Sequence, residues 1–131
     1  MTKEKLVSFV KQCQTYYLAT IDEHGKPSLR PFGTFSLIDD RIYIQTGKRK
    51  SVYQQILSSP FVALCAFDGK AWVRLTAEAF EVEDIKIKTL LLDEYPALKE
   101  MYSATDPNTI VFRLDNIHGE FIDSEKEDFQ F

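Results

Sequence analysis

Short strand-like segments separated by tight-turn signals recur along most of the chain, and this pattern restricts the fold more than any other feature. Turn signals stand at residues 22–25, 39–40 and 68–69, where aspartate and glycine favour the backbone conformations that close a hairpin. Consecutive strands joined by such short turns pair antiparallel. We therefore expect a mainly β protein whose antiparallel sheet of about six or seven strands closes into a barrel, because closure removes exposed sheet edges.

The strands and helices expected from these signals account for most of the chain. The expected strands span residues 16–21, 26–38, 41–46, 61–67, 70–82, 109–114 and 118–123, and the expected helices span residues 2–13, 51–58 and 84–102. Pro96 should divide the last helix. The second strand should be bulged or lie at an edge near Pro31, because proline donates no backbone hydrogen bond. A final hairpin is expected around Asp115 and Asn116, followed by a loose acidic tail at about 124–131.

The composition is that of an ordinary globular protein and argues against several functions. The 131 residues are 44% hydrophobic and 27% charged, which fits a single domain spanning residues 1–131. A formal net charge of −4 argues against a nucleic-acid partner. No apolar segment reaches transmembrane length, and the N-terminus resembles an amphipathic helix, so we expect no membrane partner and a cytoplasmic location. The cysteines and histidines show no metal-ligand spacing, so no metal site is expected.

Three consecutive cations, Lys48, Arg49 and Lys50, stand in the segment TGKRKSVYQQI, between an expected strand and an expected helix. The start of a helix presents unpaired backbone N–H groups and the positive end of the helix dipole. Ser51 adds a hydroxyl donor at the same place. Fixed donors together with positive charge are what a phosphate group requires. From this segment alone, a phosphate site and a solvated basic loop are both open interpretations.

Arg30, in the segment SLRPFGTF, adds a second source of positive charge. If the second and third expected strands pair through the turn at 39–40, Ser36 faces about Tyr43 and Gly33 faces about Thr46. Arg30 then lies near the cationic loop, and the two segments form one anion site. The alternative is that Arg30 pairs with one of the chain's many carboxylates.

The order of these segments resembles that of the pyridoxamine 5′-phosphate oxidase-like flavoproteins. The resemblance rests on YYLAT, DEHGKPSLRPFGTF and DDRIYIQTGKRKSVYQQILSSPFVAL, and it is strongest to the small branch that includes the Nim-type nitroimidazole reductases. It continues through GKAWVRLTAEAFEVED, LLLDEYPALKEMYS and IVFRLDNIHGEFID, so it covers nearly the whole chain. The resemblance implies a split β-barrel that forms a homodimer and binds FMN at the subunit interface.

The resemblance also implies which residues bind the cofactor. The FMN phosphate is expected on Arg30, Lys50 and Ser51, with Lys48 as a helper. The isoalloxazine ring is expected against the backbone of two segments, where the absence of a side chain on glycine lets the backbone approach a flat ring closely. The residues of these two segments are Pro31, Phe32, Gly33, Gln45 and Thr46.

Two further groups of residues have both a structural and a functional interpretation. Trp72 is expected either to stack near the flavin from the partner subunit or to be a core or interface residue without a ligand. Leu98 and Met101 belong to an apolar helical face that is expected to pack on the barrel. The alternative for this face is that it rims a substrate pocket.

The implied function is that of an FMN-dependent oxidoreductase acting on a small molecule such as a nitro compound or a quinone. The flavin performs the redox chemistry, so no catalytic side chain is assigned. NAD(P)H is a candidate electron donor that binds transiently, because the chain has no G-x-G-x-x-G segment. The C-terminal segment GEFIDSEKEDFQF lacks the Trp and Arg elements that bind the vitamin substrate in the true oxidases, which argues against pyridoxamine phosphate oxidation. The alternative is a protein that binds or senses flavin or haem without turnover, and a deazaflavin is a third cofactor option.

Overall fold

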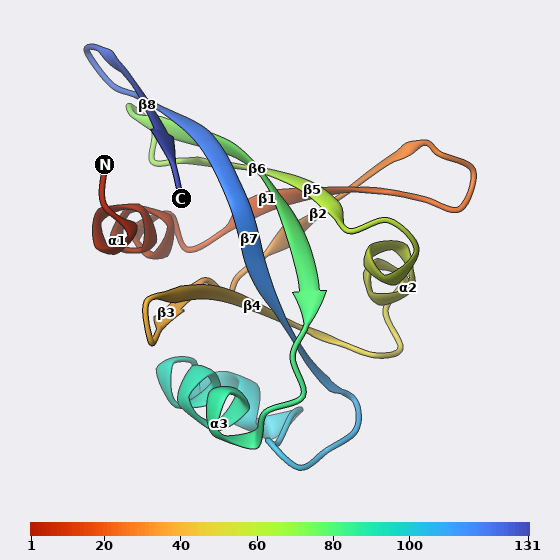
Figure 1. Ribbon diagram of the computed structural model, residues 1–131. Helices are drawn as coiled ribbons and strands as arrows, with labels where there is room; N and C mark the ends of the chain where they lie inside the picture. Colours follow the sequence, from red (N-terminus) through yellow and green to blue (C-terminus); the bar gives the residue numbers. More distant parts are fainter.

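The computed structural model describes residues 1–131 and shows an eight-stranded antiparallel sheet with helices around it (Figure 1). This arrangement confirms the expected mainly β fold. In chain order the elements are α1 (Lys3–Cys13), β1 (Tyr16–Ile21), β2 (Pro27–Phe32), β3 (Ser36–Ile38), β4 (Arg41–Gly47), α2 (Ser51–Ser58), β5 (Phe61–Phe67), β6 (Trp72–Glu81), α3 (Ile85–Glu94), the 3₁₀ helix η1 (Pro96–Glu100), β7 (Thr109–Ile122) and β8 (Lys126–Gln130).

The sheet is rolled on itself because its two ends are joined by a very short segment. The strands lie in the order β2-β1-β5-β6-β7-β4-β3, so β2 and β3 are at opposite ends. Only residues 33–35 connect them, and the step from Phe32 to Ser36 spans at most roughly 14 Å. The two ends of the sheet must therefore approach each other, which produces a split barrel.

Thr34, in this short connection, ties the ends of the sheet together. Its hydroxyl accepts a hydrogen bond from the backbone N–H of Gln45 on β4, at 2.8 Å. Its carbonyl oxygen accepts a hydrogen bond from the hydroxyl of Tyr16 on β1, at 2.6 Å. Tyr16 is buried, and its ring packs against Phe35 at a centroid distance of 5.7 Å. The closure point is thus fixed by polar contacts inside an apolar environment.

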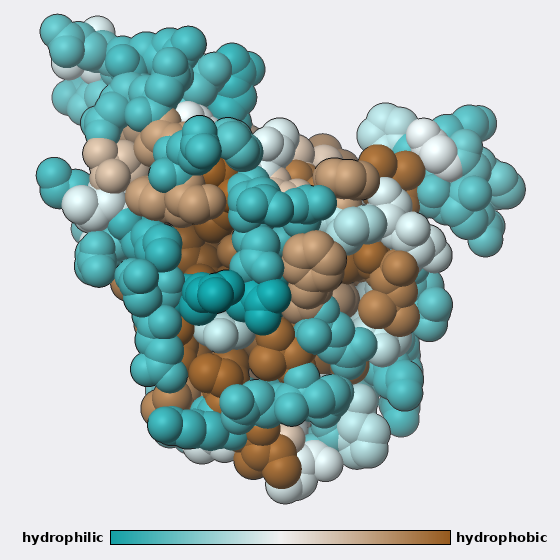
Figure 2. All heavy atoms as spheres, viewed as in Figure 1, coloured by the Kyte–Doolittle hydropathy of each residue, from teal (hydrophilic) through white to brown (hydrophobic).

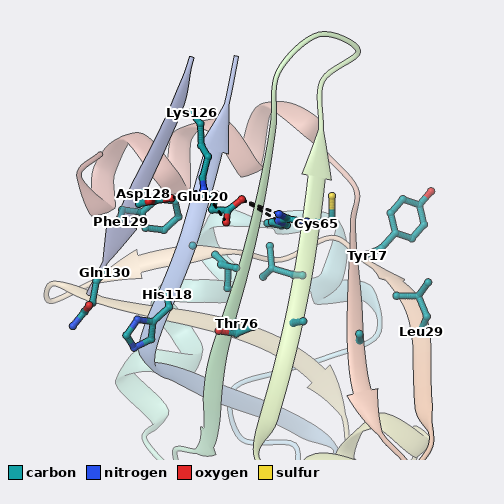
Figure 3. Close-up of a pocket in the computed structure, with 16 residues that line it drawn as sticks. Tyr17, Leu29, Cys65, Thr76, His118, Glu120, Lys126, Asp128, Phe129 and Gln130 are labelled. Carbon is teal, nitrogen blue, oxygen red and sulfur yellow. Dashed lines mark hydrogen bonds and ion pairs between the residues drawn. The ribbon is translucent and has the colours of Figure 1, made fainter. Parts of the chain in front are cut away.

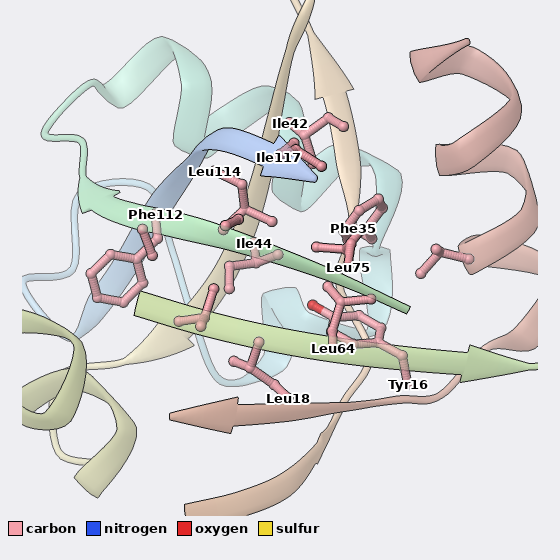
Figure 4. Packing of buried hydrophobic residues seen from close by; sticks show 14 of the residues in the cluster. Tyr16, Leu18, Phe35, Ile42, Ile44, Leu64, Leu75, Phe112, Leu114 and Ile117 are labelled. Carbon is pink, nitrogen blue, oxygen red and sulfur yellow. The ribbon is translucent and has the colours of Figure 1, made fainter. Parts of the chain in front are cut away.

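The inside of the barrel is filled by large aliphatic and aromatic side chains (Figure 4). Alternate residues along each strand point inward, as the pleat of a sheet requires. The inward residues labelled in the figure are Tyr16, Leu18, Phe35, Ile42, Ile44, Leu64, Leu75, Phe112, Leu114 and Ile117. Helices α1 and α2 extend this core with one apolar face each.

The helix boundaries follow from capping and proline. Thr2 caps α1 by accepting a hydrogen bond from the N–H of Lys5 at 3.1 Å, as expected for this residue type. Asp84 caps α3 by accepting bonds from the N–H groups of Lys86 and Ile87. Pro96 begins η1 just after α3 ends at Glu94, so the expected division is present. None of these helices is long and apolar enough to cross a membrane.

The prediction of a C-terminal hairpin around Asp115 and Asn116 is wrong. β7 runs without a turn from Thr109 to Ile122 and pairs with β6 along most of its length. Asn116 has a φ of 50°, and the ladder with β6 shifts register between Thr76 and Glu78. A positive φ at asparagine suits a bulge as well as a turn, and here it bends a continuous strand.

The tail is an ordered strand rather than the loose segment that its acidic composition suggested. β8 pairs with the second half of β7, and the backbone of Phe131 exchanges hydrogen bonds with Ile117 at 3.1 and 2.9 Å. Phe129 and Phe131 are two residues apart, so they share one face of the strand and pack against the core. The second strand, expected over residues 26–38, is in fact two strands, β2 and β3. β2 lies at an edge of the sheet, as predicted.

Replacing Gly119 by alanine is expected to destabilise the protein. An added Cβ would overlap the Phe129 ring and lie 2.9 Å from the carbonyl oxygen of Arg74, so β8 has to shift. We expect the free energy of unfolding in urea to fall by about 1–3 kcal/mol. Gly33→Ala is the matched control, because its Cβ meets nothing closer than a carbonyl oxygen at 4.0 Å. Equal stability of the two variants would contradict the packing of β8 described above.

Candidate functional site

A cavity of about 770 Å³ lies where the chain crosses from β2 to β3, and its size is typical of small-molecule sites. Three segments form its walls: β2 with the connection that follows it, the end of β4 with the start of α2, and the chain from Glu94 to Tyr102. The lining residues are Arg30, Pro31, Phe32, Gly33, Thr34, Gln45, Thr46, Lys50, Ser51, Val52, Glu94, Tyr95, Pro96, Ala97, Leu98, Met101 and Tyr102.

Eight of the ten residues expected to bind the cofactor line this one cavity. They are Arg30, Pro31, Phe32, Gly33, Gln45, Thr46, Lys50 and Ser51. The pairing of Ser36 with Tyr43 is also as predicted, although Gly33 lies outside the ladder and reaches β4 only through its neighbour Thr34. The two segments identified in the sequence therefore do come together in space.

Lys48 and Trp72 are the two residues that lie outside the cavity. Lys48 is exposed. Trp72 begins β6 and has the Arg74 guanidinium over its indole ring, 5.4 Å from the ring centre. Neither residue contributes to the cavity wall.

The start of α2 is open toward an anion. Lys50 is the N-cap residue and Ser51 the first helical residue, and no side chain caps the helix. The first turn also contains no acidic residue. The positive end of the helix dipole, the Lys50 ammonium group and the Ser51 hydroxyl therefore meet at the cavity wall without a negative partner on the helix.

Arg30, on the wall formed by β2, adds a second positive charge to the cavity without pairing with a carboxylate. Its guanidinium donates to the Leu18 carbonyl oxygen at 3.1 Å, the Ser28 hydroxyl at 2.9 Å and the Gln55 side-chain oxygen at 2.8 Å. All three acceptors are neutral, so the alternative of an ion pair is wrong. Partial burial lowers the pKa of Arg30, because desolvation penalises the charged form, but an arginine stays protonated at neutral pH.

The third wall, from Glu94 to Tyr102, includes the apolar face that was expected mainly to pack on the barrel. Leu98 and Met101 line the cavity, while Leu91 and Leu92 of the same apolar face are buried, so the face both packs on the barrel and borders the cavity. Tyr95 fixes the segment, since its hydroxyl donates to the Phe35 carbonyl oxygen at 3.1 Å and accepts from the Phe35 N–H at 2.9 Å. The only signal in the sequence was Pro96, which predicts a break in the helix but not where the break lies.

Tyr102 places a hydroxyl group next to the cationic loop. Its side chain is only 8% exposed, and an added Cβ on Gly47 would lie 2.8 Å from the hydroxyl oxygen. Glycine at position 47 is therefore what permits this close approach. The hydroxyl forms no hydrogen bond within the chain, so it is free to donate to a molecule in the cavity.

A second hollow, of about 1020 Å³, lies on the outer face of the sheet (Figure 3). Its floor is made by β1, β5, β6 and β7, and Tyr17 and Leu29 at its side are 53% and 66% exposed. Ion pairs cross it from Glu120 to Arg74 at 2.9 Å and to Lys126 at 3.5 Å. The charged groups here neutralise one another, so this hollow is a broad apolar surface with paired charges rather than an anion site.

Comparisons with known proteins identify the family of the chain. A family model described as pyridoxamine 5′-phosphate oxidase matches residues 2–122. A comparison with curated proteins found no match.

Three solved structures illustrate the range of similar proteins. A NimC/NimA family protein from Clostridium acetobutylicum is 29% identical, with 98% of this chain and 93% of that chain covered at a TM-score of 0.92. General Stress Protein 26 from Bacillus anthracis is 21% identical, with 97% and 98% covered at a TM-score of 0.78. HutZ, the haem storage protein from Vibrio cholerae, is 18% identical, with 88% and 90% covered at a TM-score of 0.66.

The family match spans most of the chain, the split barrel is shared with these structures, and the cavity gathers the residues that the family resemblance singled out. The chain belongs to the pyridoxamine 5′-phosphate oxidase family.

Proposed function

We propose that the protein binds FMN in the cavity beside Thr34 and uses it to reduce a small acceptor such as a nitro compound or a quinone. The observation that carries this proposal is the meeting of Arg30, Lys50 and Ser51 in one cavity, with no carboxylate paired to Arg30 and none in the first turn of α2. The similarity to a NimC/NimA family protein favours a small reducible substrate. Both cysteines are free, which fits the reducing cytoplasm.

The rest of the cavity suits the remaining parts of FMN. Pro31, Phe32 and Gly33 line the cavity where we place the ring, and apart from its chain neighbours Gly33 has only the Gln14 carbonyl oxygen near its Cβ position, at 4.0 Å. The Tyr102 hydroxyl is a spare donor at the phosphate end. The apolar side chains of Leu98 and Met101 line the opposite wall.

Bound FMN would supply hydride and single-electron transfer, which no amino-acid side chain provides. The role of the chain is then to bind the phosphate, orient the ring and leave one ring face open to the substrate. No acid or base among the lining residues has to move a proton for this role, so the catalytic group is the cofactor. NAD(P)H is the proposed electron donor, approaching the ring transiently.

Binding or sensing without turnover is the second candidate. His118 lines the outer hollow, and histidine is a common axial ligand of haem iron. The haem storage protein HutZ shares this fold. Absorption spectra of the purified protein separate the candidates, because flavin gives its own visible bands and haem gives a Soret band.

The activity test measures NAD(P)H oxidation by the FMN-loaded protein with a panel of nitro compounds and quinones. We expect turnover with at least one acceptor and bound FMN close to one per subunit. Flavin binding without turnover on any acceptor would favour the sensing alternative. A Soret band that depends on His118, with no flavin uptake, would reject FMN as the cofactor.

Lys50→Ala is expected to weaken FMN binding while leaving riboflavin binding unchanged. A charge-assisted hydrogen bond to phosphate contributes about 1.5–3 kcal/mol, so the FMN dissociation constant should rise by roughly one to two orders of magnitude. Riboflavin has no phosphate and should bind as before. Fluorescence titration measures both ligands.

Arg49→Ala is the matched control for Lys50→Ala. Arg49 is the adjacent exposed cation, but it does not line the cavity, so its loss should change FMN affinity by less than about twofold. Equal effects of the two substitutions would mean that the loop acts only through its overall charge. No effect of Lys50→Ala would place the phosphate elsewhere.

We also propose that the protein is a homodimer that pairs through the outer face of the sheet. Figure 2 shows hydrophilic projections at the upper left and right, at the β7–β8 and β1–β2 turns of Figure 1, with apolar side chains exposed between them. Exposed Tyr17 and Leu29 on β1 and β2 border the outer hollow. A large apolar surface bordered by polar residues is typical of a protein interface.

Leu29→Glu is expected to dissociate this dimer. Burying two uncompensated carboxylates at a symmetric interface should raise the dissociation constant at least about tenfold, seen by light scattering at micromolar concentration. Ile85→Glu is the matched control, because Ile85 is 61% exposed at the start of α3 and borders neither hollow. A parent protein that is already monomeric would reject the dimer.

A further inference from the structure

Gln55, on α2, is the residue that connects Arg30 to the rest of the fold. Its side-chain oxygen accepts hydrogen bonds from the Arg30 guanidinium at 2.8 Å and from the Thr20 hydroxyl at 2.5 Å. Thr20 is buried on β1, while Arg30 lies on β2 and lines the cavity. Three elements that are separate in the sequence therefore meet at one amide oxygen.

The orientation of this amide follows from its partners. Arginine offers only donors, so the atom facing Arg30 has to be the amide oxygen and not the amide nitrogen. The Thr20 hydroxyl, which can donate or accept, donates to the same oxygen. The Gln55 oxygen thus has two donors pointing at it, which restricts both its own position and that of the guanidinium group.

Neutrality is the second property of this arrangement. A guanidinium held by glutamate or aspartate would have its charge compensated within the protein, and an anion in the cavity would gain little from it. Here the Leu18 carbonyl, the Ser28 hydroxyl and the Gln55 amide hold the same group without compensating it. Arginine has five N–H donors, and these three bonds leave two for a ligand.

We propose that Gln55 is a positioning residue that holds Arg30 in place and leaves its charge available, so that the cavity selects flavins that carry a phosphate. The inference rests on the proposed function, since it concerns the same site. A long arginine side chain fixed in advance loses less conformational entropy on binding, which raises affinity. Gln55 acts through Arg30 and does not line the cavity itself.

The test is a set of binding titrations with FMN and riboflavin as the two probes. Gln55→Met keeps the length of the side chain and removes the acceptor, and we expect FMN affinity to fall about fivefold to tenfold while riboflavin affinity stays constant. Gln54→Met is the matched control, because Gln54 is the exposed neighbour on α2 and should leave both affinities unchanged. Thermal unfolding of each variant shows that the fold is retained.

Gln55→Glu distinguishes the effect of holding Arg30 in place from the effect of leaving its charge uncompensated. It also provides a variant that should fold if Gln55→Met does not. A glutamate can accept both hydrogen bonds, so the fold and the Arg30 position should persist. The added negative charge should nevertheless reduce the preference for FMN over riboflavin by about tenfold or more, because Arg30 then pairs within the protein. Retention of the full preference in this variant would overturn the role of neutrality.

A double-mutant cycle decides whether Gln55 acts through Arg30. In an Arg30→Ala background, Gln55→Met should cause no further loss of FMN affinity. The same loss in both backgrounds would overturn the inference, as would an Arg30→Ala effect with no effect of Gln55→Met. If the parent protein binds riboflavin as tightly as FMN, the phosphate site itself is wrong, and the proposed function fails before the inference does.

Discussion

The hydrogen bonds of Thr34 hold the point at which the barrel closes, and the candidate site depends on that closure. In a flat sheet of the same strand order, β2 and β4 would be five strand spacings apart, or roughly 24 Å. Arg30 and Lys50 could not then serve one ligand. The bonds from Tyr16 and Gln45 to Thr34 bring the two ends of the sheet together, and the space left beside this junction is the cavity.

A positive site can exist in this acidic chain because its cations are not paired with carboxylates, whereas several other cations are. The sequence has 20 acidic and 16 basic residues, and Arg41, Arg74 and Arg113 each pair with a carboxylate. Arg30 instead has three neutral acceptors, and the start of α2 has no acidic residue. Net charge therefore describes the surface as a whole, whereas the choice of local partners decides where an anion is attracted.

Local signals in the sequence were sufficient for most elements and for two walls of the cavity. Turn residues, caps and proline act over a few residues, so α1, β1, β4 and α2 and the pairing of Ser36 with Tyr43 could be predicted. The errors all involve distant partners. Asn116 bends a strand instead of closing a hairpin because β6 continues beside it. β8 is ordered because Phe129 and Phe131 pack against the core. The third wall, with Tyr95 and Tyr102, depends on where α3 packs, which no local pattern contains.

The length and place of β7 also determine when the protein can fold. β7 joins β6 to β4 with its first half and carries β8 on its second, yet it begins only at Thr109. During synthesis, β1 to β6 therefore emerge before the strand that unites them, with the edges of β4 and β6 unpaired. Unpaired strand edges promote aggregation. Sheets whose strands are far apart in the sequence also fold slowly. The nascent chain thus passes through a stage in which its sheet has two exposed edges.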